Sequence, residues 1–264
     1  MGFSFGFSLI PSWAIFLITV GVSFCAYEIG FRWGKYKGER SEQERTAPIS
    51  STIGATLGLL AFILAFTFGL AATRFEERRE LVLKDANAIE TTYRRAQYLP
   101  DPSRREIQTL LQEYVRIRTP SADPIALQHT IQQSEELQEE LWKRAVLVAE
   151  QNPTSVMAGL FISSLNEVLD IHSERIMVGA RTRIPEIIWL ALYFITILSM
   201  AAMGFHSGLA GFRSLFIHTV MILTFSGVIF LIGDLDFSQG GFLRVSQQPM
   251  LDVLQKIQKM GSST

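Results

Sequence analysis

Four stretches of the chain contain no charged residue, and each is long enough to cross a bilayer as an α-helix. The first precedes Glu28, and the other three lie between Arg45 and Arg74, between Glu186 and Arg213, and between Arg213 and Asp234. Crossing the hydrocarbon core takes about 20 apolar helical residues. The pattern therefore predicts transmembrane helices near residues 10–29, 51–73, 187–206 and 213–233.

Most charged residues lie instead between the second and third spans, in residues 74–183. Apolar residues recur there at helical spacing, first in a helix that continues out of span two through Val82, Ile89 and Tyr93. No stretch alternates apolar and polar residues with a period of two, so we predict no sheet. The fold class is therefore all-α, an integral membrane protein with a helical bundle inserted between the second and third spans.

This pattern divides the chain into four parts. They are a first transmembrane pair in residues 1–73, the soluble helical bundle in 74–183, a second transmembrane pair in 184–233 and a C-terminal tail in 234–264. Because the number of spans is even, both termini and the bundle lie on the same side of the membrane. The tight link between spans three and four lies on the other side, together with the link in residues 30–50.

The charges of the chain almost balance, with 24 Lys and Arg against 25 Asp and Glu. This near-neutral balance gives no support to nucleic-acid binding, which needs a concentrated basic surface, so we expect no nucleic acid among the partners. Cys25 is the single cysteine, which excludes an internal disulfide and a cysteine-based metal site.

Motifs of catalysis and cofactor binding are missing from the sequence. Its four histidines form no HExxH pair, and it has no Walker loop, no GxGxxG after a strand and no GxSxG. The spans also lack acids and bases apart from His206 and His218, which disfavours an ion-coupled transporter. We therefore expect a protein that is not an enzyme and that uses no metal and no cofactor.

Span two carries the most informative pattern of the four. Its small residues form a stripe along one side, which allows close contact between helices in lipid. We assign helix packing to Gly54, Ala61 and Ala65 of this stripe. Beside the stripe, Phe62 and Phe66 share a face because they are four residues apart.

The two phenylalanines allow two interpretations. In the first, they pack against a neighbouring helix or against lipid, as most membrane phenylalanines do. In the second, copies of the helix surround an axis, and the rings form a hydrophobic constriction that gates by dewetting. The pore-lining residues in the second interpretation are Phe62, Phe66, Gly58, Gly69 and Thr73.

The stretch from Ala61 through Phe62 to Phe66, with Ala72-Thr-Arg74-Phe75 at its end, resembles the neck helix of bestrophin anion channels. The whole chain is also similar to a bacterial family of bestrophin-like membrane proteins of unknown function. Three segments carry this second similarity. They are Asp85 to Glu90 with Tyr93-Arg94, Leu165 to Glu167 with Arg181 to Pro185, and Asp234 to Asp236 with Gly241, Arg244 to Ser246 and Pro249.

The resemblance implies an oligomeric, anion-permeable channel of the bacterial inner membrane, with span two lining the pore. It favours a homo-pentamer over a tetramer, lipid and inorganic anions as partners, and cytosolic termini and insert. Basic residues in link 30–50 argue for the opposite orientation under the positive-inside rule, so the residues alone leave sidedness open. Local positive charge at the pore mouth would attract anions, and we place it on Arg74, Arg78 and Arg79.

Asp234 and Asp236 stand at the end of span four, and two roles are open to them. Calcium-controlled bestrophins carry a dense acidic run here, so the pair is a candidate acidic site in the tail. However, a calcium ion usually takes six to eight oxygen ligands. Two carboxylates without EF-hand spacing favour helix capping or pairing with arginine.

The alternative function is a non-conducting membrane scaffold or signalling protein. Its support is the large insert, whose helices have Gln- and Glu-rich faces suited to binding a partner. The number of copies in the assembly separates the two functions. A ring of four or more copies favours the channel, and a monomer or dimer favours the scaffold.

Overall fold

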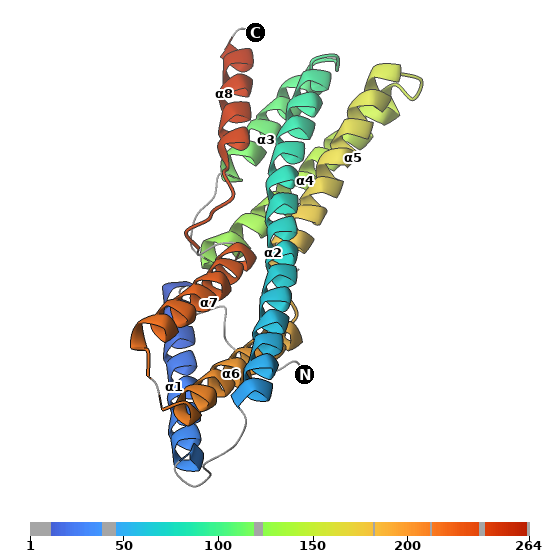
Figure 1. Ribbon diagram of the computed structural model, residues 1–264. Helices are drawn as coiled ribbons and strands as arrows, with labels where there is room; N and C mark the ends of the chain where they lie inside the picture. The colour runs from blue at the N-terminus through green and yellow to red at the C-terminus, as the bar shows by residue number, and fades with distance from the viewer. Residues whose placement is uncertain are drawn as a thin grey trace. The chain divides into compact units, whose positions relative to one another are not determined.

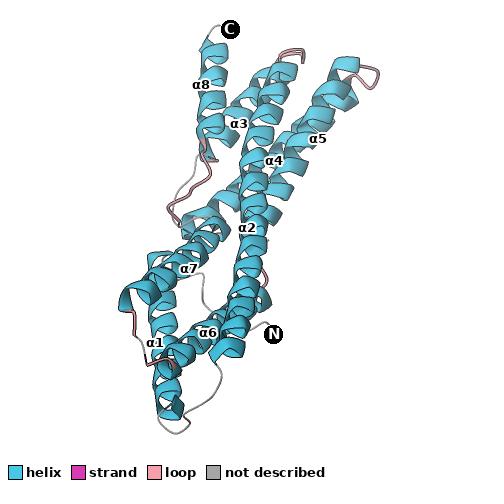
Figure 2. Cartoon of the chain, in the orientation of Figure 1, coloured by secondary structure: helices cyan, strands magenta, loops and turns pink. Residues whose placement is uncertain are grey.

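A computed structural model gives the fold, in which helices joined by loops make up the part of the chain that it describes (Figure 2). The structure describes residues 12–38, 46–118, 124–181, 183–211, 213–237 and 241–262. The helices are α1 (Ser12–Gly38), α2 (Thr46–Ala96), α3 (Ser103–Ile117), α4 (Pro124–Gln151), α5 (Val156–Ile176), α6 (Glu186–Leu209), α7 (Leu215–Asp236) and α8 (Gln248–Ser262). A π-helical turn, Met177–Arg181, follows α5 directly. No strand occurs in the described ranges, and the all-α prediction is confirmed.

Four helices are long and apolar enough to cross a membrane, and they coincide with the four predicted spans. They are Trp13–Gly38, Ser51–Ala96, Glu186–Leu209 and Leu215–Asp236. Residues 10 and 11 of the first expected span lie outside the described residues. The second helix is longer than its span because α2 continues without a break into the insert, as its apolar spacing predicts.

The chain forms two compact units, and each is built from two separate stretches of sequence. Unit 1 comprises Met1–Phe75 and Arg183–Leu243, and unit 2 comprises Glu76–Thr182 and Arg244–Thr264. The four-part division expected from the charge pattern stays a prediction. The expected tail, residues 234–264, divides between the units, and its last part forms α8 within unit 2.

In unit 1, α1 and α6 lie side by side, and glycines bring their backbones together (Figure 1). Four glycines make this contact: Gly30 and Gly34 on α1, and Gly204 and Gly208 on α6. A Cβ at Gly30 would overlap the backbone of Ala201, and one at Gly204 would overlap the backbone of Tyr27. Apolar surface alone gives helices little drive to associate in lipid, so close backbone packing holds this pair together.

The contacts of α1 fix the directions of its neighbours. Thr19 lies against Tyr193 and Gly34 against Phe205, so α1 and α6 run parallel. The ring contacts between α1 and α7 are Phe16 with Phe230 and Tyr27 with His218. These pairs make α7 antiparallel to α1. Both directions are those required of a four-span chain whose termini and insert share one side of the membrane.

Unit 2 packs α3, α4, α5 and α8 with the second half of α2 around one apolar core. Helix α8 contributes Met250, Val253 and Ile257, which are buried and share one helix face. On its polar side, Lys256 pairs with Glu90 of α2 at 2.8 Å. This ion pair lowers the pKa of the Glu90 carboxyl. Helix α8 is therefore an integral part of unit 2.

Candidate functional site

The predicted pore face of α2 is exposed in the single chain. The side chains of Phe62 and Phe66 are 69% and 62% exposed. Gly58, Gly69 and Thr73 lie on the same face and are exposed as well. A Cβ at either glycine would meet no atom within 4 Å. The structure thus brings the five predicted pore-lining residues together on one open surface.

The opposite side of α2 is buried in unit 1. Leu60, Leu64 and Ala71 belong to its apolar core. Between them, the hydroxyl of Thr67 donates to the carbonyl oxygen of Ile63 at 2.7 Å, so this polar group is satisfied within the helix. One side of α2 therefore has partners within the chain, and the phenylalanine side has room for lipid or another copy.

The small residues that we assigned to helix packing also lie on the exposed side of α2. Gly54, Ala61 and Ala65 are exposed, and a Cβ at Gly54 would meet no atom within 4 Å. These residues would pack against lipid or a second copy of the chain, and this role stays a prediction. Within the chain, glycines bring backbones into close contact between α1 and α6, a pair that the sequence pattern did not predict.

The three arginines predicted at the pore mouth have different surroundings. The guanidinium of Arg74 is mostly buried, and its Nη1 lies 3.9 Å from Oδ1 of Asp236 within unit 1. Arg78 is buried in unit 2. Arg79 is largely exposed and lies 3.4 Å from the carboxylate of Glu76. Among the three, Arg79 presents the most open positive charge.

Asp234 and Asp236 are buried at the end of α7, where they accept hydrogen bonds from the chain itself. The carboxylate of Asp234 accepts from the backbone N–H groups of Phe242 and Leu243, each at 2.8 Å. Oδ1 of Asp236 accepts from the N–H of Ile184 at 3.0 Å. Both carboxylates thus tie flanking loops to the helix end. No group of three metal-ligating side chains occurs in the described parts of the chain.

Unit 2 encloses an ion cluster centred on Asp85 of α2. Its carboxylate is fully buried, and Oδ2 accepts hydrogen bonds from Arg118, at the end of α3, and from Arg175 of α5. A second nitrogen of Arg175 lies 3.4 Å from the side-chain oxygen of Gln247, just before α8. Two guanidiniums facing one carboxylate leave this cluster with an excess of positive charge.

His172 of α5 lies beside this excess charge and is 3% exposed. Its Nδ1 contacts Nη1 of Arg118. Because a guanidinium only donates, the imidazole accepts at Nδ1 and carries its proton on Nε2. Burial, and next the charge of Arg118, lowers the pKa of His172 to about 4, although Asp85 acts in the opposite direction. The imidazole is therefore neutral at pH 7.

The hydroxyl of Tyr114 extends the cluster towards α4. It accepts a hydrogen bond from Nη1 of Arg118 at 2.9 Å and another from the side-chain amide of Gln138 at 2.8 Å. Burial raises the pKa of this phenol, against the opposing charge of Arg118. Four helices of unit 2 thus meet at one polar network.

Protonation of His172 is expected to destabilise the protein in acid. The unfolded chain binds this proton near pH 6.5, but the folded chain binds it only near pH 4. Since the unfolded state holds more protons in this window, the free energy of unfolding falls as pH drops from 6.5 towards 4. We expect His172→Gln to flatten the fall, as measured by urea unfolding of the full chain in detergent.

The matched control for this experiment is His129→Gln, at an exposed position of α4. It should leave the pH dependence of the free energy of unfolding as it is in the wild type. Equal pH slopes in the wild type and His172→Gln would contradict the role given to the buried imidazole.

Comparison with known proteins gives a family-level match over most of the chain. The family model described as a bestrophin-like domain matches residues 17–250. No curated protein matches the chain.

Solved structures agree in fold. The chain has a TM-score of 0.66 and 20% identity to a crystal structure of a mutated bacterial bestrophin homologue from Klebsiella pneumoniae, covering 95% of this chain and 98% of that one. A second structure of that homologue, solved by Zn-SAD phasing, has a TM-score of 0.63 and 19% identity, with coverage of 93% and 97%. At this identity the likeness concerns the fold. Because the family model matches from within α1 to the start of α8, the chain belongs to the bestrophin-like family.

Proposed function

We propose that this chain is the subunit of an oligomeric, anion-permeable channel in which α2 of each copy lines the pore. The observation that carries the proposal is the exposed phenylalanine face of α2, opposite a side that is buried in unit 1. Small residues beside Phe62 and Phe66 allow copies of α2 to approach closely. Rings contributed by several copies would form a narrow apolar neck that controls hydration of the pore.

Family membership and the fold of a bacterial bestrophin homologue support the channel class. The resemblance to bestrophin anion channels favours a pentamer over a tetramer, in the bacterial inner membrane with cytosolic termini and insert. Among the basic residues expected at the pore mouth, the exposed Arg79 is best placed to attract anions directly. The guanidinium of Arg74 instead faces the carboxylate of Asp236 at the end of α7.

Removing the rings of the neck is expected to raise conductance. The variant Phe62→Ala with Phe66→Ala replaces the apolar constriction by a wider one that water enters more readily. We expect currents several times those of the wild type when purified protein is studied in planar bilayers. In a chloride gradient, the reversal potential should follow chloride in both proteins.

The matched control removes two exposed rings from other membrane helices, in the variant Phe194→Ala with Phe216→Ala. It should conduct like the wild type. If the wild type conducts and the α2 double variant carries unchanged currents, the neck assignment is wrong. A reversal potential that moves towards the cation value contradicts anion permeation.

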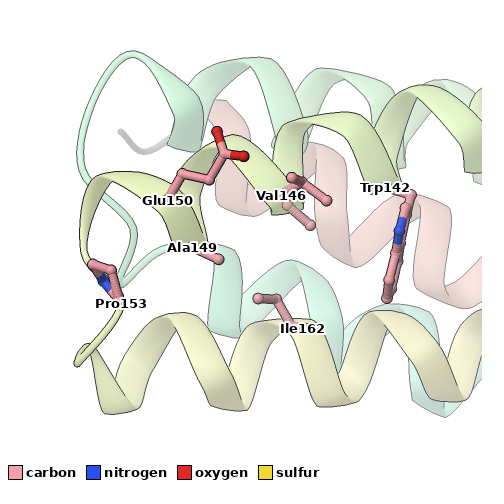
Figure 3. A pocket seen from close by; sticks show the side chains of 7 residues that line it. Trp142, Val146, Ala149, Glu150, Pro153 and Ile162 are labelled. Carbon is pink, nitrogen blue, oxygen red and sulfur yellow. The ribbon is translucent and has the colours of Figure 1, made fainter.

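One observation supports the alternative, a non-conducting scaffold. A groove of about 360 Å³ lies between α4 and α5 in unit 2. Its lining is almost entirely apolar and comprises Trp142, Ala145, Val146, Ala149, Glu150, Pro153 and Ile162. In Figure 3, Ile162 points from α5 towards the groove, and the carboxylate of Glu150 turns away from it. Native mass spectrometry that finds a monomer or dimer would favour this alternative.

A further inference from the structure

The end of α1 carries a group of basic residues at the membrane surface. Three basic residues of link 30–50, Arg32, Lys35 and Lys37, lie on the last turns of this helix, and their side chains are exposed. A fourth, Arg213, lies in the tight link between α6 and α7 and is exposed as well. None of the four belongs to the pore face proposed for α2, so their arrangement needs an explanation of its own.

Glu28 of α1 holds two of these cations in place. Its Oε1 accepts a hydrogen bond from Nε of Arg32 at 3.0 Å, and its Oε2 accepts one from Nη2 of Arg213 at 2.7 Å. The guanidinium of Arg213 also lies over the ring of Phe31, 5.0 Å from its centre. Two contacts therefore fix Arg213 on the face of α1 that carries Glu28 and Phe31. Groups that are fixed before a ligand arrives lose less freedom when they bind it.

Lys35 lies on the same face of α1. It follows Phe31 by four residues and Arg32 by three, and residues at these spacings are neighbours on a helix surface. The ion pairs at this end of unit 1 use Arg32 and Arg213, and Lys35 forms none with the described residues. We call Glu28, Arg32, Lys35 and Arg213 the Glu28 cluster. Three cations face one carboxylate in it, which leaves an excess of two positive charges.

The surroundings of the Glu28 cluster are those of a lipid interface. The first turn of α7, directly after the link, exposes Leu215, Phe216 and Ile217. The last turns of α1 expose the large rings of Trp33 and Tyr36. Such aromatic side chains favour the level of the lipid head groups, and exposed apolar residues at the start of a span face the acyl chains. The cluster therefore stands at the level where lipids carry their phosphates.

The chemistry of the cluster restricts its ligand to an anion with several acceptor oxygens. A guanidinium binds a phosphate through two parallel hydrogen bonds, and a lysine binds it as a point charge. The excess of two positive charges favours a head group whose net charge is negative over a zwitterionic one. Inorganic phosphate offers the same oxygens, but it has no acyl chains for the exposed first turn of α7 to contact.

We propose that the Glu28 cluster binds the phosphate of an anionic phospholipid at the membrane surface. Arg32, Lys35 and Arg213 contact the phosphate oxygens, and Glu28 positions the two guanidiniums. The site uses α1 and the start of α7, so it does not depend on the pore proposed for α2. It also gives the basic residues of link 30–50 a role other than setting the orientation of the chain in the membrane.

Native mass spectrometry of the full chain in detergent, titrated with dioleoyl phosphatidylglycerol, tests the proposal by resolving each bound lipid. The wild type should bind the first phosphatidylglycerol more tightly than it binds dioleoyl phosphatidylcholine. Lys35→Gln should weaken phosphatidylglycerol binding about fivefold, the usual effect of one basic residue at an anionic lipid surface. Arg213→Gln should weaken it further, because it removes a guanidinium that can form two hydrogen bonds. Lys35→Arg keeps the charge and should bind like the wild type.

The matched control is Lys37→Gln. Lys37 is also basic and exposed, but it lies two residues beyond Lys35 and therefore faces another direction. Its loss should leave the affinity for phosphatidylglycerol close to that of the wild type. Because Lys35 forms no ion pair with the described residues, Lys35→Gln should also keep the melting temperature of the wild type in lipid-free detergent. This measurement separates a lost lipid contact from a folding defect.

Four results would overturn the proposal. An unchanged affinity in Lys35→Gln would remove Lys35 from the site, and equal losses in Lys35→Gln and Lys37→Gln would indicate general attraction to anionic lipid. Equal binding of the two lipids by the wild type would show that the head-group charge is not recognised. Displacement of phosphatidylglycerol by millimolar inorganic phosphate, with stabilisation of the chain by phosphate alone, would assign the site to a soluble anion.

Discussion

Asp85→Asn is expected to reduce the free energy of unfolding by about 3–5 kcal/mol, the cost of removing one partner from a buried ion pair. The substitution keeps the size of the side chain but removes the negative charge on which Arg118 and Arg175 converge. Both guanidiniums would then stay in the interior of unit 2 without a counter-charge. We expect the full chain in detergent to unfold at lower urea concentration, with hydrogen exchange accelerated in unit 2.

Asp101→Asn is the matched control for this experiment. Asp101 also faces two arginines, Arg104 and Arg105, but the pair lies at the surface. Because water screens such pairs, the cost should stay below about 1 kcal/mol. If Asp85→Asn is as mild as Asp101→Asn, the buried cluster does not stabilise unit 2 in the way described here.

Gly204→Ala is expected to have the largest effect in the membrane helices. The new methyl group would overlap the carbonyl oxygen of Tyr27, which belongs to the backbone of α1 and has no flexible end that could move aside. The helices must separate, and the contacts of Gly30 and Gly208 weaken with them. We expect a loss of about 3 kcal/mol or more, at the upper end of the range for overpacking. Thermal unfolding in detergent measures it.

Gly227→Ala on α7 makes the same chemical change where a Cβ meets no atom within 4 Å. Alanine is the better helix former by about 1 kcal/mol, so this control should be neutral or stabilising. A similar loss in both variants would mean that the α1–α6 contact is less close than the structure shows.

The helical fold could be predicted from the sequence because its signals are local. Charge-free runs mark the spans, and helical spacing after Arg74 shows that span two continues into the insert. Helix α8 was expected as a tail, although Met250, Val253 and Ile257 carry the apolar spacing of a packed helix. The helix has only 15 residues of mixed composition, so this apolar spacing is a weak signal in the sequence.

The glycine contacts show why a local pattern does not fix a partner. Small residues recur on α2 from Gly54 onwards, and they also recur as Gly30-x-x-x-Gly34 and Gly204-x-x-x-Gly208. Both patterns permit close approach of helices. Only the three-dimensional arrangement shows that the glycines of α1 and α6 pack against each other within the chain, while the small residues of α2 face outward.

The ion cluster of unit 2 had no local signal at all. Asp85 lies 33 residues from Arg118 and 90 from Arg175, on three different helices. Each residue taken alone resembles the many solvated charges of the insert. Asp85 belongs to a segment that carries the family resemblance, but the resemblance did not indicate its partners.

Each unit is built from two separate stretches of the chain, and this determines when the unit can fold during synthesis. Unit 1 needs α6, and unit 2 needs α8, so neither can close until most of the chain has left the ribosome. Gly30 can contact Ala201 only after Ala201 has been synthesised, and at 5–20 residues per second this delay is roughly 10–30 s. Throughout that interval the glycine face of α1 lacks the α6 backbone against which it packs. Chains that terminate before α6 therefore never acquire the contact that holds α1.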